Sequence, residues 1–234
     1  MNTMMNAKTN WQTQTIGDIV ARLPRSAALF QAHRIDFCCG GQRLLGEAIQ
    51  EQNLDAPMIT TALDRLAAAQ TNAGDFLAMA AAELTDYIES RHHTYLRDAL
   101  PRITELFNVV LKAHGANHPE LFRAHAAFGR LRTDLEQHLV KEEVQLFPSL
   151  GAASAGQTAA LAAQIMAEHE AAGALLKQMR SLLDDYTAPE DACRTYRLLL
   201  EELANLEADL FQHIHLENNI LLKDIGGKGE NHHA

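Results

Sequence analysis

Histidine and glutamate recur four residues apart in two segments of the chain. His138 and Glu142 stand in LRTDLEQHLVKEEVQLFP, and His213 and Glu217 stand in QHIHLENNILL. On a helix, residues four apart share a face, and in both segments that face also carries leucines. A buried imidazole or carboxylate is costly unless a partner satisfies it. The pattern therefore indicates either a metal site or a buried hydrogen-bond network inside a helical core.

Two further segments each offer a histidine. His169, in QIMAEHEAAGALL, falls on an apolar stripe, whereas ESRHHTYL offers both His92 and His93. Helical periodicity slightly favours His92, which lies nearer the stripe of Ile88, Leu96, Leu100 and Ile103. A single histidine on an apolar face is more often a hydrogen-bonded core residue than a ligand. The position of each histidine along its helix must therefore show whether it is a metal ligand or a core residue.

The elements that would position these residues are all helical. Almost every patterned segment has the helical period, which predicts an all-α chain. Three loop signals, HGANHPE (114–120), GAASAG (151–156) and DDYTAPED (184–191), separate four long helices. The simplest architecture is an antiparallel up-down four-helix bundle, whose facing helices can build a metal site in the core.

The first seventy residues have a different organisation. Short helical units are capped at Thr15 or opened by Pro24 and Pro57, which predicts a small separate helical domain. The polar AQTNAGD, residues 69–75, is the expected linker. We therefore expect an N-terminal domain over residues 1–72 and the bundle over residues 76–226.

The positions of the histidines along the bundle axis can be compared by counting residues from each histidine to the loop that joins its helix to the next. In an up-down bundle, residues that meet lie equidistant from the loop that joins their helices. The midpoints of His93 and His138, of His138 and His169, and of His169 and His213 all fall at predicted loops. Four histidines are thus expected at one level, with Glu142 and Glu217 one turn away, about 5 Å along the helix.

Other histidines fail this comparison. His114 follows His93 by a distance of about 30 Å in a continuous helix, so we interpret it and His118 as loop histidines. His125 lies several turns from His138 and fails for the same reason. The pair His232 and His233 lies in a tail with the composition of a frayed end.

The converging set consists of nitrogen and oxygen ligands without a thiolate. Six such ligands exceed the needs of one four-coordinate zinc and leave two carboxylates able to bridge, which favours two metals. Iron is the favoured metal, although spacing does not separate iron from manganese. Nearby acidic residues could orient the rings by accepting their N–H groups, or each could be an ordinary solvated charge; they are Glu143, Glu168, Glu170 and Glu207.

The order H, HxxxE, EH, HxxxE over four helices resembles the hemerythrin-like domains. Together with IDFCCGG in the N-terminal segment, it makes the chain resemble the Repair of Iron Centres family from about residue 13 to 222. The resemblance implies a centre of two non-haem iron ions joined by an oxygen bridge, with Glu142 and Glu217 as bridging carboxylates. It favours His93 over His92, and the implied ligands are His93, His138, Glu142, His169, His213 and Glu217.

The resemblance also implies a function. Members are cytoplasmic proteins of the nitrosative and oxidative stress response that restore damaged or apo iron-sulfur proteins, plausibly by donating iron. Two alternatives use the same centre: reduction of nitric oxide or peroxide, and sensing or reversible carriage of nitric oxide or dioxygen. Whether the chain is an enzyme, and whether it forms a homodimer, stays open at this stage.

Two departures from the family pattern predict local differences. Arg34 stands where the family usually has glycine, and arginine suits a left-handed backbone poorly, so we expect a different turn before the cysteines. Leu222 and Lys223 replace the family's Leu-Phe-Pro after HIHLENN, so we expect the last helix to run further.

Three cysteines are too few for a disulfide framework. Adjacent Cys38 and Cys39 have Cα atoms about 3.8 Å apart, so a disulfide between them would be strained. A helix expected to open at the following glycines would lower a nearby thiol pKa, which makes both cysteines candidates for redox or iron transfer. The alternative is a pair of buried structural cysteines. Cys193 is interpreted as an ordinary packed residue.

Charge and hydropathy exclude some partners. The chain carries 20 Lys and Arg against 30 Asp and Glu, a formal charge of -10, which argues against nucleic acid and against an anionic membrane surface. It contains no uncharged apolar run long enough to cross a bilayer, and its first residues lack the apolar segment typical of a secretory signal, so we expect no leader. We therefore expect a cytoplasmic protein without a membrane partner.

Overall fold

The computed structural model describes residues 9–70, 76–152, 155–223 and 225. The described residues form helices and no β-strand, so the predicted all-α class is confirmed. The chain divides into two compact units, one of Met1–Met79 with His215–Ile220 and the other of Ala80–Ile214 with Leu221–Ala234. The expected linker lies largely outside the described residues, as do His232 and His233.

The N-terminal unit is built from short helices, as expected. The Thr15 hydroxyl accepts a hydrogen bond from the Asp18 N–H, and Asp55 caps the helix that contains Pro57. Trp11 Nε1 donates to Asp64 Oδ1 at 2.7 Å. The elements are η1 (Trp11–Thr13), α1 (Ile16–Arg22), α2 (Ser26–Ala32), α3 (Leu45–Glu51), α4 (Ala56–Ala68) and η2 (Phe76–Ala78).

The turn after α2 has a left-handed backbone at Arg34, although the sequence predicted a different turn there. Arg34 has φ 55°. Its N–H donates to Gln31 O at 3.1 Å, and the Ile35 N–H donates to Phe30 O at 2.8 Å. These two bonds form a Schellman motif, in which the left-handed position usually belongs to glycine. The expectation of a different turn is therefore wrong, because the two capping bonds and the burial of Ile35 hold Arg34 in this conformation.

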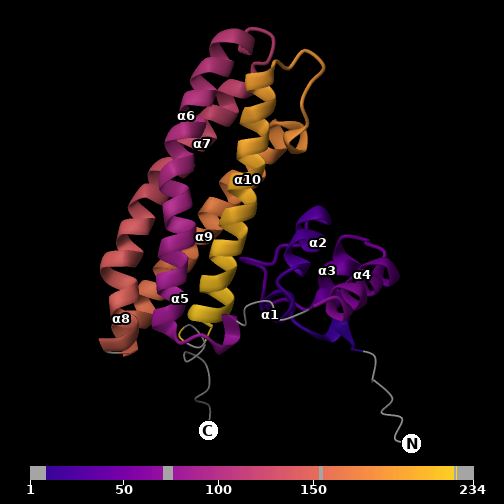
Figure 1. Cartoon of the computed structure of the whole chain (residues 1–234), viewed down its shortest axis with the longest axis vertical. Coiled ribbons are helices and arrows are strands. Elements are labelled where there is room, and N and C mark those ends of the chain that lie inside the picture. Colours follow the sequence, from indigo (N-terminus) through magenta and orange to yellow (C-terminus); the bar gives the residue numbers. More distant parts are fainter. Residues whose placement is uncertain (1–8, 71–75, 153–154, 224, 226–234) are drawn as a thin grey trace, which may run out of the picture. The chain divides into compact units, whose positions relative to one another are not determined.

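The second unit is an up-down bundle of four long helical segments (Figure 1). The first comprises α5 (Ala81–Ile88), η3 (Glu89–His93) and α6 (Thr94–His114). The second comprises α7 (Glu120–Lys141), η4 (Glu142–Leu146) and α8 (Phe147–Ala152). The third is α9 (Ala155–Leu182), followed by η5 (Asp184–Tyr186); the fourth comprises α10 (Arg194–Leu216) and η6 (Glu217–Leu221).

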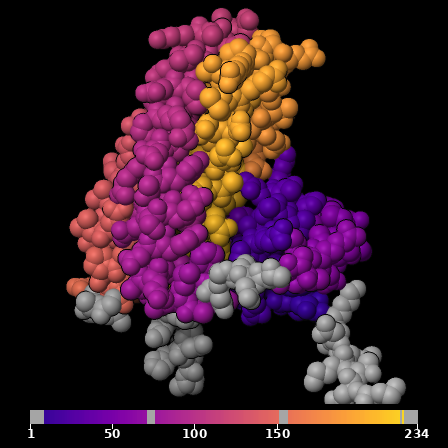
Figure 2. Space-filling view, viewed as in Figure 1, coloured from indigo at the N-terminus to yellow at the C-terminus, as the bar shows by residue number. Residues whose placement is uncertain are grey.

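The predicted loops are confirmed at 114–120 and 184–191. The loop predicted at 151–156 is wrong at its described positions, because α8 continues to Ala152 and α9 begins at Ala155; residues 153 and 154 lie outside the described residues. A continuous apolar core runs through the bundle and includes Phe107, Leu131 and Leu206. At the surface, α6 and α10 lie side by side (Figures 1 and 2), where Arg102 donates to Glu202 at 2.6 Å. None of the described helices is both long enough and apolar enough to span a membrane.

Three π-helical segments interrupt the bundle, and each contains a predicted ligand. His93 ends η3, Glu142 begins η4, and Glu217 begins η6. A π turn holds an extra residue and shifts the faces of the helix, and such turns are frequent at functional sites. The last helical segment ends at Leu221, so the expected extension is wrong.

Candidate metal centre

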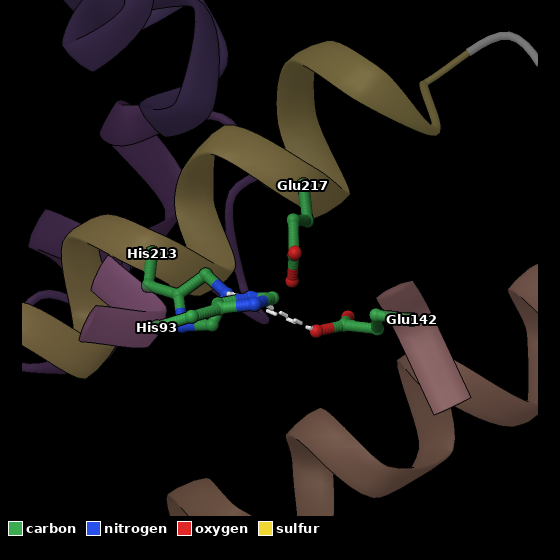
Figure 3. Close-up of side chains that lie close together, drawn as sticks. All are labelled: His93, Glu142, His213 and Glu217. Atoms are coloured by element: carbon green, nitrogen blue, oxygen red, sulfur yellow. Dashed lines mark hydrogen bonds and ion pairs between the residues drawn. The ribbon is translucent and has the colours of Figure 1, made fainter. Parts of the chain in front are cut away.

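All six predicted ligands are buried in the same region of the bundle. His138 is the most exposed of them, at 4%. Their ligand atoms fall into two groups, and within each group all atoms lie within 4.8 Å of one another. The first group is His93, Glu142, His213 and Glu217 (Figure 3). The second is His138, Glu142, His169 and Glu217.

Glu142 and Glu217 belong to both groups. Figure 3 shows their carboxylates approaching the two imidazoles from different helical segments. A carboxylate has two oxygens and can give one to each of two cations. The sharing therefore fits two neighbouring metal positions, each with two imidazoles of its own.

The imidazoles face one another through their Nε2 atoms. These atoms lie 3.2 Å apart in His93 and His213 and 3.1 Å apart in His138 and His169. Two nitrogens bound to one metal at about 2.0–2.1 Å are separated by about 2.9 Å for a right angle at the metal and about 3.3 Å for a tetrahedral angle. The observed separations lie in this range, so each pair of histidines can hold one cation between its two rings.

Glu142 is a fully buried carboxylate. Neither of its oxygens receives a hydrogen bond of good geometry within the described part of the chain. His138 Nε2 nevertheless lies 3.1 Å from Glu142 Oε1, and His93 Nε2 lies 3.4 Å from Oε2. Burial alone would raise the pKa of Glu142, but the imidazoles of His138, His169 and His93 outweigh it and hold the pKa well below its usual range. A buried, ionised carboxylate so placed could bind a metal ion.

Two outer carboxylates orient the rings. His93 Nδ1 donates to Glu143 Oε1 at 2.7 Å, and Arg97 also pairs with Glu143. With Nδ1 as the donor, the lone pair of Nε2 points into the centre. Burial opposes ionisation of Glu143, but His93 and Arg97 lower its pKa.

The same arrangement recurs at the second pair of imidazoles. His138 Nδ1 donates to Glu168 Oε2 at 2.9 Å, and Lys141 donates to the other oxygen of Glu168. Burial opposes ionisation of Glu168, but Lys141 and His138 lower its pKa. Each histidine pair therefore includes one ring that is fixed by a charged carboxylate.

Glu207 and Glu170 were also proposed to orient histidine rings, but their surroundings are different. Glu207 is buried and accepts hydrogen bonds from Arg180 and from Tyr186 Oη, the latter at 2.8 Å. Glu170 is exposed, and among the described residues no hydrogen bond joins it to a histidine. The expectation is thus wrong for these two, because their side chains leave the helix on other faces.

His92 supports the centre without entering either ligand group. It is buried, its Nδ1 donates to Asp209 Oδ1 at 3.1 Å, and its ring stacks on that of His213 with centroids 5.5 Å apart. The regular helical period that favoured His92 does not allow for the π turn at Glu89–His93. Asp209 escaped sequence reasoning, although it precedes His213 by four residues and so shares its face.

A cavity of about 150 Å³ adjoins the centre. Its lining includes His138, His169 and His213 together with Lys141 and Glu168. A water molecule takes about 30 Å³ in the liquid, so the cavity has room for a small ligand beside these rings.

The two cysteines of the N-terminal unit are not joined in a disulfide. The sulfurs of Cys38 and Cys39 lie 3.8 Å apart, and the Cys38 thiol donates to Asp36 Oδ1 at 3.2 Å. The interaction with Cys39, burial and the charge of Asp36 together raise the pKa of Cys38. The expected lowering is therefore wrong for Cys38, because α3 begins only at Leu45 and its N-terminus is not next to the thiol.

The end of the last helical segment belongs to the same unit and holds the cysteine loop. Asn219 Nδ2 donates to Phe37 O at 3.2 Å and to Cys38 O at 3.0 Å. A side chain at Gly17 would meet Asn219 at 2.6 Å, so glycine is needed there. Burial lowers the pKa of His215 to about 4, which keeps its ring neutral beside Phe37 O.

A helical bundle with buried histidine and glutamate clusters defines a protein of the hemerythrin class. The hemerythrin HHE cation-binding domain model matches residues 84–225, and ScdA_N, a domain of unknown function, matches residues 12–67. The iron-sulfur cluster repair protein ScdA of Staphylococcus haemolyticus is 31% identical over 210 residues, which cover 88% of this chain and 95% of the relative. The iron-sulfur cluster repair protein YtfE of Yersinia pseudotuberculosis is 33% identical over 213 residues, 91% of this chain and 96% of the relative. The chain belongs to this ScdA/YtfE family, which confirms the resemblance seen in the sequence.

Proposed function

We propose that the centre holds two iron ions joined by an oxygen bridge. His93 and His213 would bind one ion and His138 and His169 the other, while Glu142 and Glu217 would bridge them. The observation that supports two ions rather than one is the presence of both carboxylates in both ligand groups. When bound, such a pair would supply one-electron chemistry and open positions for nitric oxide or dioxygen.

The protein's own residues prepare these positions. Glu143 and Glu168 keep an N–H on the outer nitrogen of His93 and His138, so that the inner nitrogens stay available. The apolar core excludes water from the remaining side of the centre. Preformed ligands lower the cost of ordering them when a metal enters.

We propose that the protein repairs damaged iron-sulfur proteins by donating iron. The observation that carries this proposal is the similarity to iron-sulfur cluster repair proteins, which spans both units of the chain. The ligand set supports the donor role, because it lacks the thiolates that would compete with a cluster's own cysteines for iron. The cavity beside His138 and His169 gives the second pair of ligands access to small molecules.

Iron transfer can be measured directly. The iron-loaded protein is mixed with an apo ferredoxin, sulfide and a reductant, and cluster formation is followed by visible circular dichroism while iron lost from the donor is counted. We expect stoichiometric transfer, with none from Glu142→Gln and normal transfer from Glu136→Gln, an exposed position on the same helix. Failure to transfer, together with many turnovers of nitric oxide to nitrous oxide, would assign a reductase instead.

We also propose that Cys38 and Cys39 take part in this transfer or in its redox chemistry. Two thiol sulfurs 3.8 Å apart, one of them donating to a carboxylate, support the proposal. The double variant Cys38→Ala, Cys39→Ala should slow cluster formation while retaining its iron, and Cys193→Ala serves as the control. An unchanged rate in the double variant would limit both cysteines to a structural role.

A further inference from the structure

A second group of metal-binding side chains lies at the other end of the bundle. The turn between α6 and α7 and the loop that precedes α10 lie together there (Figure 1). His114 ends α6, His118 lies in the turn, and Asp191 lies in the loop. One ligand atom from each of these three residues lies within 4.8 Å of the others. Two connections that are far apart in sequence thus place three possible ligands around one point.

His118 is oriented as a metal ligand would be. Its Nδ1 donates to Glu120 Oε1 at 3.0 Å, while its Nε2 faces Asp191, 3.0 Å and 3.1 Å from the two carboxylate oxygens. Metal-binding histidines commonly have one nitrogen fixed by a carboxylate and the other directed at the cation. Glu120 fills the first role, which leaves Nε2 for the second.

Both histidine rings rest on a buried aromatic side chain. The Tyr196 ring lies 5.3 Å from the ring of His114 and 5.6 Å from that of His118, measured between centroids, and Tyr196 is 2% exposed. This platform restrains the rings before any ion binds.

Cys193 lies outside this group of ligand atoms. It is exposed, contrary to the packed position expected from the sequence, because it precedes α10 in the loop.

We propose that His114, His118 and Asp191 form a mononuclear Zn²⁺ site. Two imidazoles and a carboxylate favour zinc over magnesium or calcium, which prefer oxygen ligands. The bound ion would tie the turn after α6 to the loop before α10. This site is separate from the proposed iron centre and does not depend on the proposed repair function.

Zinc binding by the full-length, iron-loaded chain tests the site. His232→Gln and His233→Gln are included in every sample, so that these histidines do not compete. Titration against a chromophoric chelator should show one tight zinc site per chain. His118→Gln and Asp191→Asn should each raise its Kd about tenfold or more. His125→Gln, a partly exposed histidine of α7 outside the group, should leave the Kd unchanged.

Two measurements complete the test. Cobalt in place of zinc should give the visible spectrum of a tetrahedral ion, and His118→Gln should remove that spectrum. Iron content should be equal in all variants, which separates this site from the buried centre. Equal zinc affinity in the parent, His118→Gln and Asp191→Asn would overturn the proposal.

Discussion

The two ends of the bundle present metal-binding side chains in opposite ways. At one end, the six proposed ligands lie on helical segments and none is more than 4% exposed. At the other end, His114, His118 and Asp191 lie at helix termini and in loops, and Asp191 is exposed. The length of α6 separates the two ends, about 30 Å for its 21 residues.

This difference shows how the same residue types can serve different tasks. Buried ligands on rigid helices are placed before the metal arrives, and Glu143 and Glu168 fix their rings. Loop ligands reach water and can exchange an ion freely, but fewer neighbours hold them. We therefore expect substitutions at the buried end to have larger effects than substitutions at the loop end.

The largest effect is expected from the loss of a shared carboxylate. Glu142→Ala should reduce the iron content from about two ions per chain to less than one, because Glu142 belongs to both ligand groups. Metal analysis of the purified protein measures this directly. Glu136→Ala, on the exposed face of α7, is the matched control. Retention of both ions in Glu142→Ala would remove Glu142 from the ligand set.

Metal removal should also affect the two ends unequally. Chelation of iron should lower the unfolding temperature more than chelation of zinc, because the buried ligands join all four helical segments whereas the loop ligands join two connections. Calorimetry of the parent and of His118→Gln separates the two contributions. A greater loss on zinc removal would reverse the comparison.

A smaller effect is expected from the carboxylates that orient the rings. Glu168→Gln should weaken iron binding about 10- to 100-fold, since the ring of His138 would lose its charged partner. Glu170→Gln is the matched control, because Glu170 also neighbours His169 but is exposed. Competition with a chelator gives both affinities. Equal affinities would show that Glu168 serves only the surface pair with Lys141.

Much of the bundle and of its centre could be predicted from the sequence. The helical period and the loop residues gave four helices, and the loop midpoints placed the four histidines at one level. The π turns at His93, Glu142 and Glu217 could not be predicted, because an extra residue in one turn leaves no compositional mark. The choice between His92 and His93 therefore needed the family pattern.

The group of His114, His118 and Asp191 was not predicted from the sequence, for a different reason. An up-down bundle brings its first and third loops to the same end, so HGANHPE and DDYTAPED had to meet. That rule was applied to helical histidines but not to the loops themselves. It would have placed Asp191 near His114 and His118.

The smallest effect is expected between the two ends, at the surface pair of Arg102 and Glu202. Arg102 is about half exposed, so water screens the pair, and Arg102→Ala should cost about 0.2–1 kcal/mol of unfolding free energy. Neither metal affinity should change, because the apolar core that includes Phe107 and Leu206 carries the structure between the ends. Urea unfolding of Arg102→Ala, Glu202→Ala and the double variant isolates the pair energy, and metal titrations of the same proteins test the ends. A change in metal affinity at either end would show that the pair of Arg102 and Glu202 couples the two sites. The bundle would then act as one unit and not as a scaffold with two independent ends.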